Sequence, residues 1–160
     1  MSIDLVNIGV AQLKIGNSPQ ILRTILGSCV GICIFDRNKK IGGLAHILLP
    51  EANDNANPEK YANTAVPILV EMLLKQGCKR EFMSAKIAGG AAMFKFTQGN
   101  VLGQIGDRNV DAVKAALADK KIPIVNEDIG GNTGRVIDFF MADGHLRVKA
   151  GHVEQNYYKV

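Results

Sequence analysis

Short apolar runs separated by turn residues restrict this chain to a fold built largely on strands. Val6–Ala11 and Gln20–Leu26 are rich in aliphatic residues, and Gly16-Asn17-Ser18-Pro19 separates them. Val30–Asp36 and Ile41–Leu49 form a second pair of runs. Runs of this length, bounded by Gly, Pro, Asn and charged residues, are typical of β-strands. We therefore expect paired strands in the first part of the chain.

A helix with one defect is predicted after these strands. Apolar residues recur over Ala62–Leu74 at the spacing of one helical face. Asn57 before Pro58 is a suitable start, with Asn57 as the cap, and Gly77 is a natural stop. Pro67 lies inside the run, where its ring and its missing N–H predict a kink or a break.

The second half of the chain mixes one more helix with further strands. Asp107–Lys120 has the spacing of an amphipathic helix, with Asp107 as its N-cap. Four strands are expected: Ser84–Ala88, Ile122–Val125, Arg135–Met141 and His145–Lys149. The last two predict a hairpin. This order predicts an α/β (α+β) layered sandwich, in which a mixed, mostly antiparallel sheet is covered by two main helices. We expect residues 1–160 to form one domain.

Composition and charge exclude several classes of function. The chain has 19 basic and 15 acidic residues, and the basic ones are scattered rather than clustered in the stripe that nucleic-acid binding requires. The three cysteines lie far apart with no C-x-x-C, which argues against a disulfide framework and a thiolate zinc site. The glycine stretches Gly89-Gly90 and Gly130–Arg135 lack the ending of a P-loop. We expect these glycines to let backbone segments pack closely or to bend the sheet, and we expect no nucleic-acid partner, cofactor or metal.

The N-terminus does not resemble a targeting segment. Met1–Leu5 has no basic region followed by an apolar run. No stretch approaches the roughly 18 apolar residues that suggest a membrane span. We therefore expect a cytoplasmic protein without membrane insertion.

Cys29 has the setting of a catalytic nucleophile. It follows the run that ends at Leu26 and lies between Gly27-Ser28 and Gly31. Small neighbours let a substrate carbonyl approach the sulfur, and N–H groups of the Gly27-Ser28 turn can stabilise the oxyanion that forms. The same N–H groups would favour the thiolate over the thiol. The alternative is a buried structural cysteine, since free Cys is among the most buried residue types.

His46 is the candidate base for this nucleophile. If Val30–Asp36 and Ile41–Leu49 pair as a hairpin, the ends that carry Cys29 and His46 come together. Thiol and imidazole would then be within reach, as a Cys–His pair requires. The alternative is an imidazole that merely completes a hydrogen bond at the end of a sheet.

A third group should orient the imidazole, and Thr24 is the nearest suitable side chain in the sequence. Ser28 is a poorer choice because its position beside Cys29 points it elsewhere. Thr24 is equally explained by the β-propensity of threonine, so this role stays open. Cys33 and Cys78 have no His or glycine context, and we expect both to be structural.

Taken together, these residues resemble a known family. The segment Thr24–Gly31, followed by His46 within Gly42–Pro50, is similar to the CheD family of chemoreceptor glutamine deamidases. The likeness continues through four further blocks: Lys60–Ala65, Ala85–Ala91, Ile105–Val110 and Gly130–Arg135. The blocks occur in order over nearly the whole chain, so the likeness is specific.

The resemblance implies a fold related to the deamidating bacterial toxins and a Cys–His–Thr triad. Cys29 and His46 carry over directly. The family's orienting Thr can stand one residue away from Thr24, where this chain has Arg23. The resemblance also implies two protein partners. One is the cytoplasmic domain of a methyl-accepting chemoreceptor, the substrate; the other is a CheC-type phosphatase.

The resulting hypothesis is a protein-glutamine deamidase with a Cys–His thiol mechanism. Cys29 would attack the side-chain amide of a receptor Gln, and His46 would transfer the proton to the departing ammonia. The backbone N–H of Cys29, with a neighbouring turn donor, would hold the oxyanion. Glutamyl methyl esters could be hydrolysed by the same route. The alternative hypothesis is a regulatory binding module for a CheC-type phosphatase that makes little catalytic use of these residues.

Overall fold

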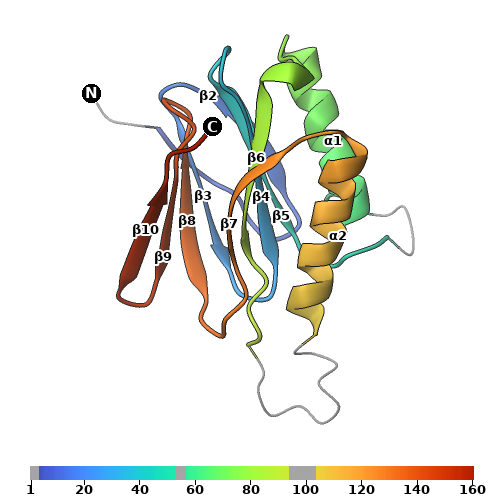
Figure 1. The fold of residues 1–160 in the computed structure, drawn as a ribbon, viewed down its shortest axis with the longest axis vertical. Helices are drawn as coiled ribbons and strands as arrows, with labels where there is room; N and C mark the ends of the chain where they lie inside the picture. Colours follow the sequence, from blue (N-terminus) through green and yellow to red (C-terminus); the bar gives the residue numbers. More distant parts are fainter. Residues whose placement is uncertain (1–3, 53–56, 94–103) are drawn as a thin grey trace.

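Three layers make up the fold in the computed structural model, which describes residues 4–52, 57–93 and 104–160 (Figure 1). A five-stranded outer sheet forms one layer, a five-stranded central sheet the next, and two helices the third. The fold class expected from the sequence is confirmed. The expectation of one sheet is corrected in one respect, because the strands divide into two sheets that face each other.

The outer sheet has the strand order β1-β3-β8-β9-β10, and only β1 and β3 are parallel. Its strands are β1 (Leu5–Asn7), β3 (Ile21–Leu26), β8 (Arg135–Phe140), β9 (Leu146–Ala150) and β10 (Val153–Tyr157). The predicted hairpin at the end of the chain is confirmed as β8 and β9. The sequence reading missed β10, whose residues are mostly exposed and carry no apolar alternation.

The central sheet has the order β2-β5-β4-β6-β7, and only β6 and β7 are parallel. Its strands are β2 (Leu13–Asn17), β4 (Val30–Asp36), β5 (Ile41–Ile47), β6 (Met83–Gly89) and β7 (Ile124–Ile129). The predicted pairing of β4 with β5 is confirmed. The predicted strand Val6–Ala11 is wrong: the chain leaves β1 at Asn7, crosses to the other sheet and starts β2 at Leu13.

Two apolar cores lie on the two faces of the central sheet. Val30, Ile32 and Ile34 of β4 pack toward the helices, while Cys33 and Phe35 pack toward the outer sheet. Every residue of β4 is buried, as expected of a strand covered on both faces. Side chains that face the outer sheet therefore lie in a narrow layer between the two sheets.

The helices α1 (Ala62–Lys75) and α2 (Ile105–Asp119) cover the face of the central sheet that is turned away from the outer sheet (Figure 1). Short 3-10 helices, Pro58–Lys60 and Arg80–Phe82, precede α1 and β6. The predicted start at Asn57 is wrong for α1, because Asn57 caps the first 3-10 helix and Tyr61 caps α1.

Two further expectations about the helices are resolved by the structure. Pro67 lies inside α1, where it removes a backbone hydrogen bond that packing of the neighbouring buried Val66 and Leu69 offsets. The predicted N-cap Asp107 is wrong, since Gln104 is the N-cap and Asp107 lies in the first turn of α2. Negative charge is favourable there because of the helix dipole.

Candidate active site

The turn that carries Cys29 is the crossing point between the two sheets. β3 of the outer sheet ends at Leu26, and β4 of the central sheet begins at Val30. The chain changes sheets within the three residues between them. Cys29 is 9% exposed and belongs to the apolar core between the sheets. The thiol therefore lies at the rim of the inter-sheet layer.

His46 faces the same layer from the neighbouring strand. It is 2% exposed and pairs across the ladder with Gly31, two residues after Cys29. Side chains two residues apart on a strand share a face. The β4–β5 pairing thus brings the ends that carry Cys29 and His46 to the same side of the central sheet, as the sequence predicted.

Thr24 contacts His46 from the opposite sheet. The Thr24 hydroxyl oxygen lies 2.7 Å from His46 Nδ1 and 2.7 Å from the carbonyl oxygen of Ile8. Arg23 instead pairs with Asp138, with 2.6 Å between Nε and Oδ1. Of the two positions that the sequence left open, the structure places Thr24 against the imidazole and Arg23 away from it.

This hydrogen-bond chain determines which nitrogen of His46 carries the proton. A backbone carbonyl can only accept, so the Thr24 hydroxyl donates to Ile8. The Thr24 oxygen must then accept from Nδ1–H of His46. Neutral His46 consequently keeps the lone pair on Nε2, and this atom makes no hydrogen bond to the described residues. An unpaired ring nitrogen in a buried position is suited to take a proton from a reacting group.

The backbone of His46 is fixed as well. Its carbonyl accepts from the N–H of Ala11 and its N–H donates to Gln12, at 3.0 and 2.9 Å. The segment between β1 and β2 therefore binds the backbone of β5 at His46. Through the carbonyl of Ile8 it also binds the Thr24 hydroxyl.

Burial keeps both Cys29 and His46 uncharged. Desolvation raises the pKa of the Cys29 thiol, although the backbone N–H of Cys29 itself lowers it in part. Desolvation lowers the pKa of His46 from 6.5 to about 4. At neutral pH the site therefore holds a thiol and a neutral imidazole. A backbone N–H of the turn favours the thiolate, as expected, but desolvation has the larger effect on the pKa of Cys29.

The carbonyls of the Cys29 turn are all bound to neighbouring segments. Gly27 C=O accepts from Ala91, Cys29 C=O accepts from Gly90, and Ser28 C=O accepts from the side-chain amide of Asn109. In a planar trans peptide the following N–H points the opposite way. The N–H groups of Ser28 and Cys29 therefore point away from these partners, and neither donates to another described residue. Such a pair of N–H groups can serve as an oxyanion hole.

The end of β6 forms the wall behind the turn. A Cβ atom on Gly89 would lie 2.2 Å from the Cys29 carbonyl oxygen, and Gly89 has φ +111°. The prediction of close packing is confirmed for Gly89-Gly90 and is wrong for Gly130, where an added Cβ would have no atom within 4 Å. Arg135, which is 7% exposed, donates to Gly89 C=O at 3.2 Å and pairs with Asp128 at 2.8 Å. The guanidinium thus ties this wall to β7.

Sequence reasoning singled out neither Arg135 nor Asn109. Asn109 is fully buried on the face of α2 that also carries Val113 and Leu117. A polar residue at i, i+4 spacing with buried apolar ones was the available signal. The remaining cysteines are free and buried, and burial raises the pKa of Cys33 to about 12.

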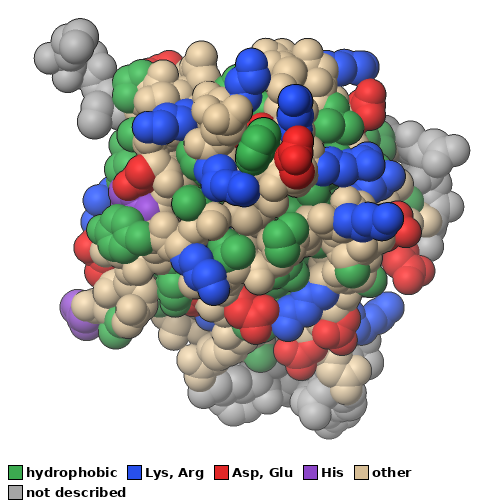
Figure 2. Space-filling view, turned by 45° about the horizontal axis from the view of Figure 1, so that its top comes forward, with side chains coloured by type: hydrophobic (Ala, Val, Ile, Leu, Met, Phe, Trp, Pro, Cys, Tyr) green, Lys and Arg blue, Asp and Glu red, His purple; other side chains and the backbone are tan. Residues whose placement is uncertain are grey.

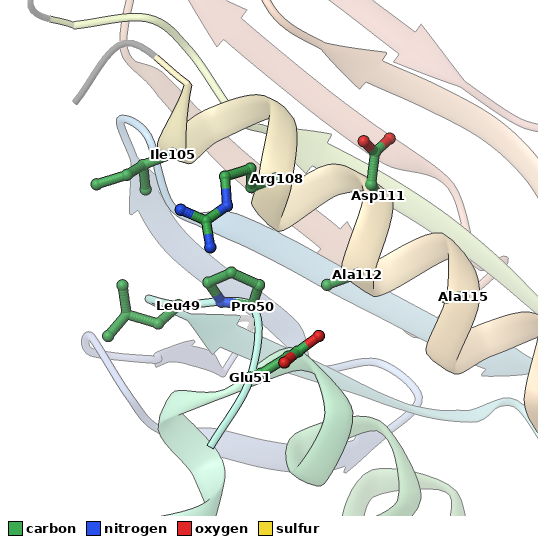
Figure 3. Close-up of a pocket in the computed structure, with 8 residues that line it drawn as sticks. All are labelled: Leu49, Pro50, Glu51, Ile105, Arg108, Asp111, Ala112 and Ala115. Atoms are coloured by element: carbon green, nitrogen blue, oxygen red, sulfur yellow. The ribbon is translucent and has the colours of Figure 1, made fainter. Parts of the chain in front are cut away.

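A pocket of about 530 Å³ lies between α2 and residues 49–51, and none of the predicted catalytic residues lines it. Figure 3 shows Arg108 extending from α2 toward Pro50, whereas Asp111 points away from the segment that carries Pro50. The full lining comprises Leu49, Pro50, Glu51, Ile105, Arg108, Asp111, Ala112 and Ala115.

The face shown in Figure 2 is neither wholly basic nor wholly acidic, because Lys and Arg side chains are interspersed with Asp and Glu. Among the residues that the structure describes, no helix has the length and apolarity needed to cross a membrane.

Comparison with known proteins gives a consistent family. The family model described as CheD chemotactic sensory transduction matches residues 48–150. This range begins after Cys29 and His46, so it carries no information about either. The chain is 44% identical over 153 residues to a probable chemoreceptor glutamine deamidase CheD of Clostridium novyi, covering 93% of this chain and 94% of that protein.

Two further relatives carry the same name. A probable chemoreceptor glutamine deamidase CheD of Oceanobacillus iheyensis is 50% identical over 140 residues, covering 84% of each chain. One of Methanococcus vannielii is 42% identical, covering 95% of this chain and 99% of that protein. Among solved structures, the Bacillus licheniformis hypothetical protein YfiH matches with a TM-score of 0.49 and 16% identity, covering 72% of this chain and 49% of that one. A likeness this weak has no functional meaning.

Proposed function

The chain belongs to the CheD family, and we propose that it is a protein-glutamine deamidase that acts on chemoreceptors in chemotaxis. The substrate would be a Gln side chain in the cytoplasmic domain of a methyl-accepting receptor, which makes the cytoplasm the site of action. Relatives that carry this name align over most of the chain, and their similarity supports the proposed substrate class.

The observation that carries the proposed mechanism is the buried hydrogen bond between Thr24 and His46. It leaves the lone pair on Nε2 of His46, which has no hydrogen bond to the described residues, and the β4–β5 pairing brings the ends that carry His46 and Cys29 to the same side of the central sheet. Cys29 is the nucleophile, His46 the general base and acid, and Thr24 the group that orients the imidazole.

The reaction begins from the neutral pair. His46 Nε2 takes the thiol proton while the Cys29 sulfur bonds to the amide carbon of the Gln side chain. The oxyanion is held by the N–H groups of Ser28 and Cys29 in the turn that follows Gly27. When the tetrahedral intermediate collapses, the C–N bond breaks and the nitrogen leaves as ammonia with the proton from His46.

A thioester then joins Cys29 to the former Gln side chain. Water gives a proton to His46 and attacks the thioester carbon, the C–S bond breaks, and the proton returns to the sulfur. The product is Glu, which adds one negative charge to the receptor. A glutamyl methyl ester would form the same thioester with methanol as the leaving group, so we include ester hydrolysis in the proposal.

The test uses two cysteines of the same inter-sheet core. The protein is incubated with a receptor cytoplasmic domain, and Gln-to-Glu conversion is mapped by mass spectrometry. Cys29→Ala should abolish conversion. Cys33→Ala, which removes a thiol from the same core, should retain it. Conversion by Cys29→Ala at the rate of the parent would refute the assignment.

A CheC-type phosphatase is the second protein partner that we propose, on the resemblance alone. The alternative of a regulatory module without catalytic use predicts that Cys29→Ala still binds and regulates the phosphatase while receptor Gln residues stay unchanged even with the parent protein. Rapid alkylation of Cys29 does not separate the two cases, because burial keeps its thiol protonated at rest. Deamidation of the receptor does separate them.

A further inference from the structure

We propose that Asn109 is a positioning residue for this reaction, because its side-chain amide fixes the Ser28–Cys29 peptide so that the Cys29 N–H faces the substrate carbonyl. The inference rests on the proposed function, since it assigns the residue that sets the oxyanion hole of that site. It concerns a helix residue far from Cys29 in the sequence that contacts the turn through one hydrogen bond.

The contacts of Asn109 connect both halves of the site. Its Nδ2 atom lies 3.1 Å from the carbonyl oxygen of Ser28 and 3.0 Å from that of Leu48. Both partners are carbonyls, which only accept, so the NH2 group must face them and each of its hydrogens has a partner. Ser28 precedes Cys29, and Leu48 follows His46 by two residues.

The geometry of one peptide group turns this contact into an effect on the reaction. The C=O of Ser28 and the N–H of Cys29 belong to the same planar trans peptide and point in opposite directions. A donor that holds the carbonyl on the α2 side therefore directs the N–H to the other side. The second bond, to the Leu48 carbonyl, fixes the end of the strand that carries His46 relative to the Cys29 turn.

Close backbone packing fixes the helix that carries Asn109. A Cβ atom on Gly106 would lie 2.4 Å from the carbonyl oxygen of Gly90, and one on Gly90 would lie 2.6 Å from Val110. Gly90 in turn donates its N–H to Cys29 C=O at 2.9 Å. The first turn of α2 thus touches the wall of the Cys29 turn directly, so the amide of Asn109 has little freedom to move.

The cost of burying this side chain indicates that packing alone does not explain it. Asn109 is fully buried, and its Oδ1 makes no hydrogen bond within the described parts of the chain. An unpaired buried oxygen is unfavourable, and an apolar residue would fill the position without that cost. The two donated hydrogen bonds are what an apolar residue could not supply.

The test separates the oxyanion hole from the nucleophile by using two reagents. The first is a peptide whose Gln amide is replaced by an aldehyde. The Cys29 sulfur adds to its carbonyl carbon and the thiol proton passes to His46 Nε2, so the reversible adduct carries an oxyanion that the oxyanion hole stabilises. The second is iodoacetamide, which alkylates the sulfur by displacing iodide at a saturated carbon and forms no oxyanion.

Asn109→Ala should weaken aldehyde binding and lower kcat toward the receptor by about a hundred-fold, the usual effect of losing an oxyanion donor. KM and the rate of alkylation should change by less than about three-fold, since neither depends on that donor. Val113→Ala is the matched control, because Val113 is equally buried one turn later on α2. It should lower stability without lowering aldehyde affinity.

The proposal would be overturned if Asn109→Ala left the aldehyde affinity unchanged, or if it lowered the aldehyde affinity and the alkylation rate by the same factor. It would also be overturned if Val113→Ala lowered the aldehyde affinity as much as Asn109→Ala, or if the parent protein formed no aldehyde adduct. If Asn109→Ala does not fold, Asn109→Asp keeps the shape and removes at least one donor. A parent that forms the adduct but leaves receptors unmodified would refute the proposed function and not the role of Asn109.

Discussion

At the scale of single residues, the site depends on how burial changes the chemistry of ordinary side chains. Cys29 and His46 are each at most 9% exposed, so desolvation keeps both neutral. A neutral imidazole is a base only if the correct nitrogen is free, and one hydroxyl from another sheet decides which nitrogen that is. We therefore expect Thr24 to influence the proposed reaction through its hydrogen bond to His46.

Removal of that hydroxyl should lower both the rate of the reaction and the stability of the fold. Thr24→Val keeps the shape but leaves Nδ1–H of His46 and Ile8 C=O without their partner. The loss of a buried hydrogen-bond partner costs about 1–3 kcal/mol, and deamidation should fall by at least roughly ten-fold. Thr24→Ser should restore most of the activity, which steady-state kinetics would measure. A Thr24→Val variant as fast as the parent would exclude the orienting role.

The acid sensitivity of stability should report His46 directly. Its pKa is about 4 in the folded protein and near 6.5 when exposed. Below pH 6.5 the unfolded chain takes up a proton that the folded protein does not accept until about pH 4. The free energy of unfolding should therefore fall between these values, by about 3 kcal/mol at most.

His46→Gln, which cannot take up this proton, provides the comparison for urea denaturation at several pH values. It should lose less stability than the parent between pH 6.5 and pH 4. Parallel curves for the two proteins would show that His46 is not buried in its neutral form.

At the scale of elements, the candidate site is built from strand ends and turns that meet at one place. The bodies of the strands hold these ends in position. The Cys29 turn joins two sheets, and the end of β6 and the start of α2 close around it. The sequence indicated the β4–β5 hairpin, because its partners are adjacent and separated by a short polar connection. It did not indicate that β1 and β2 belong to different sheets, since no local signal distinguishes a crossing from a turn.

Substitution at the end of β6 should show how tightly these elements meet. Gly89→Ala would strain the backbone, with φ +111°, and would also place Cβ 2.2 Å from Cys29 C=O. Gly130→Ala has a comparable φ of +81° with no atom within 4 Å, so it isolates the backbone strain. That strain costs about 1–2 kcal/mol.

Gly89→Ala should therefore lose clearly more stability in urea denaturation than Gly130→Ala, and it should also lose deamidase activity. Equal losses of stability would mean that the Cys29 turn can move away from β6, and that the wall behind it does not hold its position.

At the scale of the whole molecule, the two sheets are held together by polar contacts as well as by their shared core. Asp128 of β7 lies in the central sheet, and it accepts hydrogen bonds from Arg135 and Tyr157 of the outer sheet at 2.8 and 2.6 Å. Desolvation and the bond to Asp128 raise the pKa of Tyr157 to about 12. The hydroxyl is therefore a donor at neutral pH.

Loss of this link should destabilise the molecule far more than loss of an exposed ion pair. Arg135→Ala leaves the mostly buried Asp128 carboxylate without its positively charged partner, and about 3 kcal/mol should be lost. Lys114→Ala breaks a pair whose side chains are each 42% exposed, and the loss should stay below about 1 kcal/mol. Thermal unfolding of the two variants would compare them. Similar losses would indicate that the inter-sheet pair contributes little.

The sequence by itself determined most of the elements and the two residues that we propose to react. Each of these is a local property that a short segment of sequence shows: the periodicity of the strands, the glycines around Cys29, and the hairpin that carries His46. Only the tertiary structure decided the division into two sheets, the contact of His46 with Thr24 and not with Arg23, and the contacts of Arg135 and Asn109. Each of these depends on which side chains from distant segments face one another across a buried layer. That arrangement is fixed by packing of the whole chain, and no short pattern encodes it.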